Sequence, residues 1–170
     1  DYAIGEPQIL NAQDYGLPQM RKRLFVVGIK RSLGLSSFKY PAKMPLLRKA
    51  TEYLNPSNKV PIEYYLPEKG YKWTTEVERN KNKARMNRDV IGCQTAVQQF
   101  NWSGDFRMEL AEKRHFDAPG VYVTKYSGSA EKLRNAFGDN DVVVRKLMPE
   151  ECMRLMGFEN FKIVVDDQIA

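Results

Sequence analysis

Two arginines near the start of the chain, Arg21 and Arg23, have a side-chain type and a spacing that can hold a planar polar group. Residues two apart on an extended chain point to the same side, so the two guanidiniums should face one way. A guanidinium presents a rigid fork of N–H donors. Two such forks on one face at a sheet edge can grip a nucleic-acid base and a phosphate. The alternative is a pair of surface arginines on a hairpin.

Positive charge is gathered in parts of the chain rather than spread evenly. The net charge is +6, yet residues 15–51 hold nine basic residues and no acidic one, and residues 79–88 hold five more. A segregated basic surface indicates a polyanion partner, most simply nucleic acid, although a solvated basic face is the alternative. Arginine, lysine and glutamine suit contacts to phosphates and base edges. The candidates are Arg79, Lys81, Lys83, Arg85, Arg88 and, just after them, Gln98.

Apolar runs at the two ends of the chain predict the elements that position these side chains. Residues 3–10 and 24–29 are strand candidates, and the second run is continuous, as is typical of a strand covered on both faces. A turn-rich connector joins the two strands, so they should pair antiparallel. Residues 142–144 predict another strand. A helix should then begin at Pro149 and end at a Gly157 cap.

The middle of the chain is expected to be a loop-rich insert. We predict a short helix over residues 46–54, an irregular stretch over 55–71, and strands over 90–100 and 120–125.

Composition excludes several classes of protein. Hydrophobic residues make up 42% of the chain, so a core can form. No apolar run approaches the roughly 20 residues that span a bilayer, so no membrane segment is expected. Two cysteines and one histidine are too few for a zinc finger or a disulfide framework. We therefore expect reduced thiols, a cytoplasmic chain and no metal.

Two stretches resemble motifs of the cytosine-C5 DNA methyltransferases. Residues 11–28, NAQDYGLPQMRKRLFVVG, resemble motif VIII, whose core is Gln-x-Arg-x-Arg before an apolar strand. Residues 144–158, VRKLMPEECMRLMGF, resemble motif IX, except that Met148 stands where the family has threonine. The two motifs occur in the family's order, on either side of its target-recognition domain.

This resemblance implies an α/β fold with two parts. Residues 1–31 and 144–170 would supply an edge β-hairpin and a helix of a Rossmann-like catalytic domain. Residues 32–143 would be a small, loop-rich, mainly β target-recognition domain with its lead-in. Family members, often bacterial restriction-modification enzymes, move methyl from S-adenosylmethionine to C5 of a cytosine flipped out of double-stranded DNA.

The resemblance also implies roles for single residues. In the family a cysteine thiolate adds to C6 of cytosine, and an arginine stabilises the charge that develops on the ring and its C2 oxygen. That role passes to Arg21 and Arg23, with Gln19 as a supporting polar residue. Thr95, at an imperfect match to a threonine–aliphatic pair, is a candidate DNA contact. Arg145 is another, with a structural salt bridge as its alternative. Met148 removes the usual N-cap of the following helix, worth about 1 kcal/mol.

Four motifs of the complete family enzyme do not occur in the sequence. They are Phe-x-Gly-x-Gly for the cofactor, Pro-Cys for the nucleophile, Glu-Asn-Val for the acid, and the Gly-Asn of motif X. We therefore expect a C-terminal part of a methyltransferase that is inactive alone, binds no cofactor itself and is completed by the N-terminal catalytic half of the same protein.

Two other functions stay open at this point. The first is a non-catalytic DNA-binding module or a subunit of a split methyltransferase, against which the base-gripping motif VIII argues. The second is a tRNA cytosine methyltransferase. The long insert between the two motifs favours a sequence-reading DNA enzyme over a tRNA enzyme.

Overall fold

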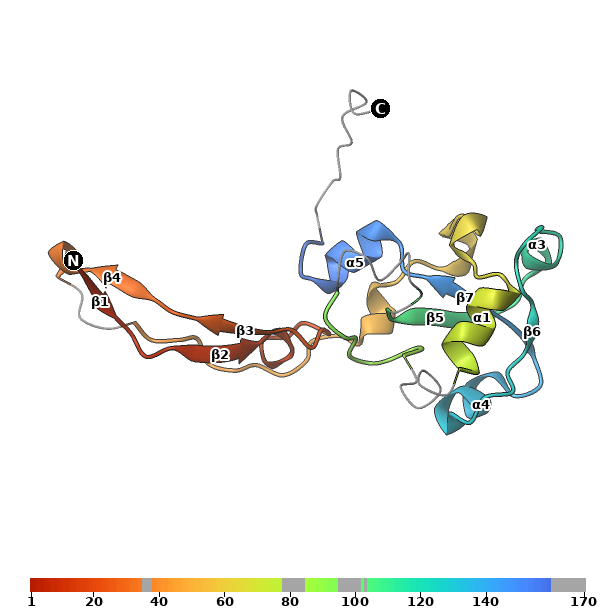
Figure 1. Ribbon diagram of the computed structural model, residues 1–170, viewed down its shortest axis with the longest axis horizontal. Coiled ribbons are helices and arrows are strands. Elements are labelled where there is room, and N and C mark those ends of the chain that lie inside the picture. The colour runs from red at the N-terminus through yellow and green to blue at the C-terminus, as the bar shows by residue number, and fades with distance from the viewer. Residues whose placement is uncertain (35–37, 78–84, 95–101, 103, 160–170) are drawn as a thin grey trace, which may run out of the picture.

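A two-stranded ribbon formed by the N-terminal 30 residues projects from an α/β unit that contains the remaining strands and the helices (Figure 1). The computed structural model describes residues 1–34, 38–77, 85–94, 102 and 104–159. Along these ranges no helix is long and apolar enough to cross a membrane.

The ribbon consists of two antiparallel strand pairs placed end to end. Strand β1 (Tyr2–Ile4) pairs with β4 (Gly28–Lys30), and β2 (Gln8–Asn11) pairs with β3 (Lys22–Phe25). Between the pairs, three residues (5–7) oppose two (26–27), which makes a bulge where Pro7, lacking an N–H, is tolerated. The predicted antiparallel pairing of the first two strands is thus confirmed.

Within this chain, most of the large apolar side chains of the ribbon are exposed. Ile9 is 71% exposed and Leu24 is 65% exposed. The cover on both faces that the apolar run over residues 24–29 predicts is not supplied by this chain, and that expectation stays a prediction for the complete sheet. Two strands alone cannot bury two apolar faces, because each face needs a packed layer. The exposed set is Tyr2, Ile4, Ile9, Leu24, Phe25 and Val26.

A three-stranded antiparallel sheet forms the centre of the α/β unit. Strand β7 (Asp141–Lys146) lies between β5 (Phe106–Leu110) and β6 (Thr124–Lys125). Val142 and Val144 pack into one core with Leu66, whereas Val143 packs into the core on the other face. The apolar run at 142–144 therefore forms the predicted strand and is buried on both faces.

Along the described ranges, four helices belong to the α/β unit and five short 3₁₀ turns are distributed along the chain. Helix α5 begins at the predicted Pro149 and is followed by Gly157, whose φ of +94° suits a glycine. Met148 supplies no side-chain cap, but the Glu151 carboxylate accepts a hydrogen bond of 2.8 Å from the Met148 N–H. The helices are α1 (Glu68–Thr75), α3 (Lys113–Phe116), α4 (Glu131–Phe137) and α5 (Pro149–Leu155). The 3₁₀ turns are η1 (Ala12–Asp14), η2 (Arg31–Leu33), η3 (Ala50–Tyr53), η4 (Ser57–Lys59) and η5 (Ile62–Tyr64).

Several expected elements in the middle of the chain differ from those observed. The helix predicted over 46–54 is only the 3₁₀ turn η3, and the stretch expected to be irregular runs into helix α1. Of the strand predicted over 90–100, Ile91 forms an isolated bridge with Gln19, and residues 95–100 lie outside the described part. Strand β7 continues across the predicted domain boundary at residue 144. Residues 144–146 therefore belong with the sheet, because one strand is one structural unit.

His115 is buried in a polar cluster beside the sheet. Its exposed fraction is 1%, its ring centroid lies 4.3 Å from that of Tyr65, and its Nδ1 accepts a hydrogen bond of 2.9 Å from the Glu112 N–H. Burial lowers the pKa of His115, and the neighbouring Arg114 charge lowers it further.

This lowered pKa should make stability depend on pH. An unfolded histidine binds a proton as the pH falls through about 6.5, whereas folded His115 does so only at lower pH. The free energy of unfolding should therefore decrease as the pH is lowered from 7.5 to 5.5. Thermal melts of the wild type and of His115→Phe, which keeps a ring against Tyr65, check this. Equal pH dependence in both would contradict the prediction.

Candidate nucleic-acid interface

The backbone around Arg21 is fixed where the connector meets the ribbon. Arg21 directly precedes β3, and its N–H donates a hydrogen bond of 2.9 Å to Oδ1 of Asn11. Its carbonyl accepts a hydrogen bond of 3.1 Å from the Ala12 N–H. Arg23 lies two residues further along the chain, in β3, and is paired with Leu10 of β2. Both backbone polar groups of Arg21 are therefore hydrogen-bonded to the preceding connector.

The two arginine side chains converge on a single atom. Nη1 of Arg21 lies 3.5 Å from Sγ of Cys93, and Nη2 of Arg23 lies 3.6 Å from the same sulfur. Arg23 also donates through Nη1 to the Lys22 carbonyl at 2.7 Å. The same-side placement predicted from the spacing of two residues is therefore confirmed.

An open cavity of about 280 Å³ lies beside these guanidiniums. Its wall is mostly apolar, so it combines flat hydrophobic surface with two fixed positive charges. Such a combination suits a planar ligand that carries polar edges or negative charge. The lining residues are Leu10, Ala12, Tyr15, Arg21, Arg23, Phe25 and Pro41.

Gln19 lies where residues 18–20 pair with Ile91, a contact that we call the joint, and it does not line this cavity. Its exposed fraction is 1%, and its neighbours pair with Ile91: the Met20 N–H donates to the Ile91 carbonyl and the Ile91 N–H to the Pro18 carbonyl, each at 2.9 Å. Among the residues described, Gln19 Nε2 has no hydrogen-bond partner. The joint brings residues 91–94 against the arginine pair.

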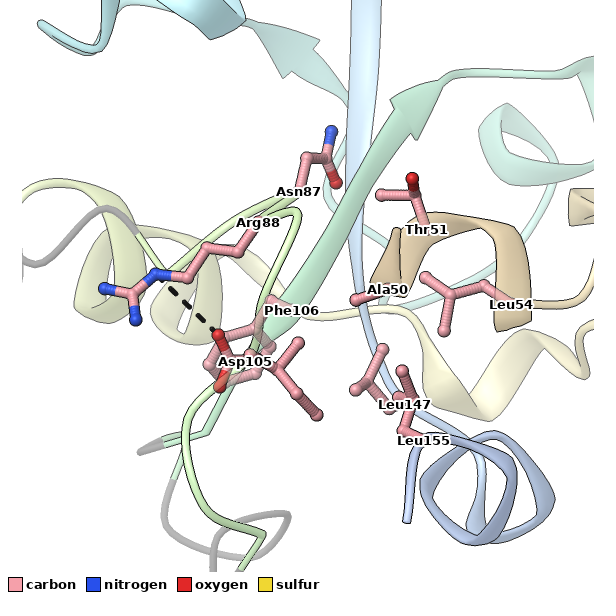
Figure 2. A pocket seen from close by; sticks show the side chains of 10 residues that line it. Ala50, Thr51, Leu54, Asn87, Arg88, Asp105, Phe106, Leu147 and Leu155 are labelled. Carbon is pink, nitrogen blue, oxygen red and sulfur yellow. Dashed lines mark ion pairs between the residues drawn. The ribbon is translucent and has the colours of Figure 1, made fainter. Parts of the chain in front are cut away.

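Only part of the predicted basic segment falls in the described ranges. Arg85 is exposed, and Arg88 is half-buried with its Nε 3.9 Å from Oδ1 of Asp105. Burial raises the pKa of the Asp105 carboxyl, while the Gly92 N–H and the Arg88 charge oppose that rise. Figure 2 shows the Arg88 guanidinium extending away from the apolar side chains of Leu147 and Leu155. Arg79, Lys81, Lys83, Thr95 and Gln98 lie outside the described residues.

Arg145 requires a correction, because it forms a buried salt bridge and is not placed to contact DNA. Its exposed fraction is 0%. Its Nη1 and Nη2 each donate to one oxygen of Glu151 at 2.9 Å, and Nη2 also donates to the Asn55 carbonyl at 3.3 Å. Arg145 lies in the central strand of the sheet, where both faces are covered. The structural alternative raised from the sequence is therefore the one observed.

Sequence reasoning did not identify Cys93 as part of this site. Cys93 follows Arg23 by 70 residues, lies in a segment without a recognised motif, and reaches the arginines only through the joint at Gln19 and Ile91. No local pattern signals such a long-range contact. Cys93 and Cys152 are both half-buried thiols that are not joined in a disulfide.

Comparison with known proteins decides the family. The family model for C-5 cytosine-specific DNA methylases matches residues 1–170. This chain belongs to that family. The family inferred from the two sequence motifs is thus confirmed, while the assignment of residues 11–28 and 144–158 to motifs VIII and IX stays a prediction.

Several curated relatives of this chain are Type II methyltransferases. M.HpaII of Haemophilus parainfluenzae is 27% identical over 99% of the chain and 45% of its own length. M.FnuDI of Fusobacterium nucleatum is 42% identical over 91% of the chain and 45% of its own length. M.Bsp6I of Bacillus sp. (strain RFL6) is 34% identical over 89% of the chain and 42% of its own length. The chain therefore spans less than half the length of these relatives.

Proposed function

We propose that this chain is the part of a DNA cytosine-5-methyltransferase that grips the target cytosine and reads the surrounding site. The complete enzyme would transfer methyl from S-adenosylmethionine to C5 of a cytosine flipped out of duplex DNA. The observation that supports this most is the convergence of Arg21 and Arg23 beside the open, mostly apolar cavity.

In this proposal the two guanidiniums act on the base through charge and hydrogen bonding. N–H donors held in place before the reaction stabilise negative charge as it develops on the ring and its C2 oxygen. The apolar wall, including Tyr15 and Phe25, offers surface to the face of the base and keeps water from it. Arg21 and Arg23 would thus bind and orient the base and stabilise its charge.

The residues of this chain do not form the family's cofactor site. The sequence contains neither Phe-x-Gly-x-Gly nor Pro-Cys. S-Adenosylmethionine would supply the methyl group in the complete enzyme, and we assign no step of that transfer to the residues described here.

We further propose that the ribbon docks on the N-terminal catalytic half of the same protein. Residues 1–31 and the segment that follows β7, with α5, would complete the catalytic domain, and the chain from residue 32 to the end of β7 would be the target-recognition domain with its lead-in. Exposed apolar side chains on the ribbon, such as Ile9 and Leu24, support this arrangement, because a covering domain would bury them.

The substrate test compares duplex DNA with tRNA in the complete enzyme. We expect 5-methylcytosine to form in the duplex and not in the tRNA. Methylation of tRNA alone would contradict the proposal and favour the tRNA enzyme, and binding of duplex without methylation would favour a non-catalytic DNA-binding module.

Duplex binding should weaken as salt is raised, since lysine and arginine displace counterions from phosphates. Arg85→Ala should lower the slope of log Kd against log salt by about 1, the effect of one lost phosphate contact. Lys59→Ala, which removes an exposed charge from η4 outside the basic segment, is the matched control and should leave the slope unchanged. A slope that Arg85→Ala does not alter would exclude Arg85 as a phosphate contact.

A further inference from the structure

The sulfur of Cys93 is the meeting point of the two arginine side chains that the proposed function places on the target base. Its position is fixed from both directions along the chain. On one side, Ile91 pairs with residues 18–20, and the Gly92 N–H donates to Oδ2 of Asp105 at 2.9 Å. On the other side, the Cys93 thiol donates to the Gln94 carbonyl at 3.7 Å. The segment that carries the sulfur is therefore held against residues 18–20, directly before Arg21, by contacts that do not involve the arginine side chains.

This geometry leaves the sulfur lone pairs available to the guanidiniums. Because the thiol hydrogen is directed to the Gln94 carbonyl, the remaining acceptor capacity can face Arg21 and Arg23. Two like charges on residues two apart repel each other, and long arginine side chains have many rotamers. A shared acceptor restrains both side chains in one convergent arrangement before any base arrives.

The chemistry of the acceptor also suits a temporary contact. A thiol sulfur is a weak hydrogen-bond acceptor, so the arginines can exchange it for a base at little cost. A carboxylate at the same place would form charge-assisted bonds with both guanidiniums and compete with the base. Cysteine therefore orients the arginines without neutralising the charge that the reaction needs.

We infer that Cys93 is a positioning residue for Arg21 and Arg23 in cytosine methylation. The inference rests on the proposed function of those arginines. Cys93 itself does not touch the reacting atoms in this assignment. It acts by keeping the two guanidiniums where the base will bind, and so links residues 91–94 of the recognition part to the ribbon.

The test uses the complete methyltransferase under single-turnover conditions with saturating duplex DNA. Cys93→Ala should slow methylation about tenfold, the scale of losing one orienting contact, while Kd for DNA changes less than about twofold. Cys93→Ser, which keeps a neutral acceptor, should restore the rate to within about threefold of the wild type. Cys93→Asp should be slower than Cys93→Ala. Melting temperatures show whether each variant is folded.

Cys152→Ala is the matched control, because Cys152 is also a half-buried thiol outside a disulfide, and its Sγ lies 3.5 Å from the Gln94 side-chain oxygen. It should methylate at the wild-type rate. A Cys152→Ala enzyme as slow as Cys93→Ala would show a general packing effect and overturn the inference.

Arginine variants separate this inference from the function on which it rests. In an Arg21→Ala/Arg23→Ala enzyme, adding Cys93→Ala should cause no further loss, because the groups that Cys93 positions are gone. If the arginine variant is as fast as the wild type, the proposed function fails. If that variant is slow but Cys93→Ala has no effect alone, or slows both enzymes equally, only the positioning role fails.

Discussion

Arg23→Ala in the complete methyltransferase should lower the single-turnover methylation rate by about 10²-fold, while the affinity for non-specific duplex DNA falls less than about threefold. Arg23 lies on the exposed β3 strand and directs Nη2 to the point where Arg21 also converges. A donor that acts on developing charge affects the transition state more than the ground state, so the rate should suffer more than binding.

Lys22→Ala is the matched control for this experiment. Lys22 is the exposed neighbour of Arg23 on the same strand, but alternation places it on the other face of the ribbon. It removes the same charge and should leave the rate near that of the wild type. Equal losses of rate and affinity in Arg23→Ala would instead assign Arg23 to anchoring the DNA backbone.

Glu151→Ala should lower the free energy of unfolding by about 3–5 kcal/mol, because it leaves the buried Arg145 charge without its main partner. Both Glu151 oxygens are fully used: each accepts from Arg145 at 2.9 Å, one also from the Asn55 N–H at 2.7 Å and the other from the Met148 N–H at 2.8 Å. Chemical denaturation measures the loss. The carboxylate thus joins β7, the start of α5 and the segment before η4.

Glu150→Ala tests whether the effect belongs to this carboxylate or to any acid in the first turn of α5. Glu150 is more exposed than Glu151, and its carboxylate accepts a hydrogen bond of 3.5 Å from the Asn55 side-chain amide. Its loss should cost under about 1 kcal/mol. A Glu151→Ala protein as stable as Glu150→Ala would show that Arg145 finds sufficient compensation from Glu109, 3.5 Å away.

The sequence alone predicted those strands and helices whose characteristic residues lie next to one another in the chain. The connector at 11–18 and the apolar run at 24–29 predicted an antiparallel pair, and the residues around Pro149 predicted α5. The spacing of Arg21 and Arg23 was enough to place both on one side, because strand alternation is a property of the backbone alone. The family, too, was evident from two short motifs.

Only the tertiary structure decided which basic side chains are buried in salt bridges and which are exposed. Arg145 and Arg23 are both basic residues in strands, yet the first is buried against Glu151 and the second is exposed beside a cavity. Strand β5 has the alternating sequence FRMEL, but its pairing with β7 rather than with another strand depends on how the chain folds.

The contact between Cys93 and the two arginines shows the same limit most clearly. It joins residues 70 and 72 positions apart through a single bridge between Gln19 and Ile91. Sequence fixes which chemical groups are available and which side of their own strand they face. The distance between groups on different segments depends on how those segments pack, which is a property of the whole fold.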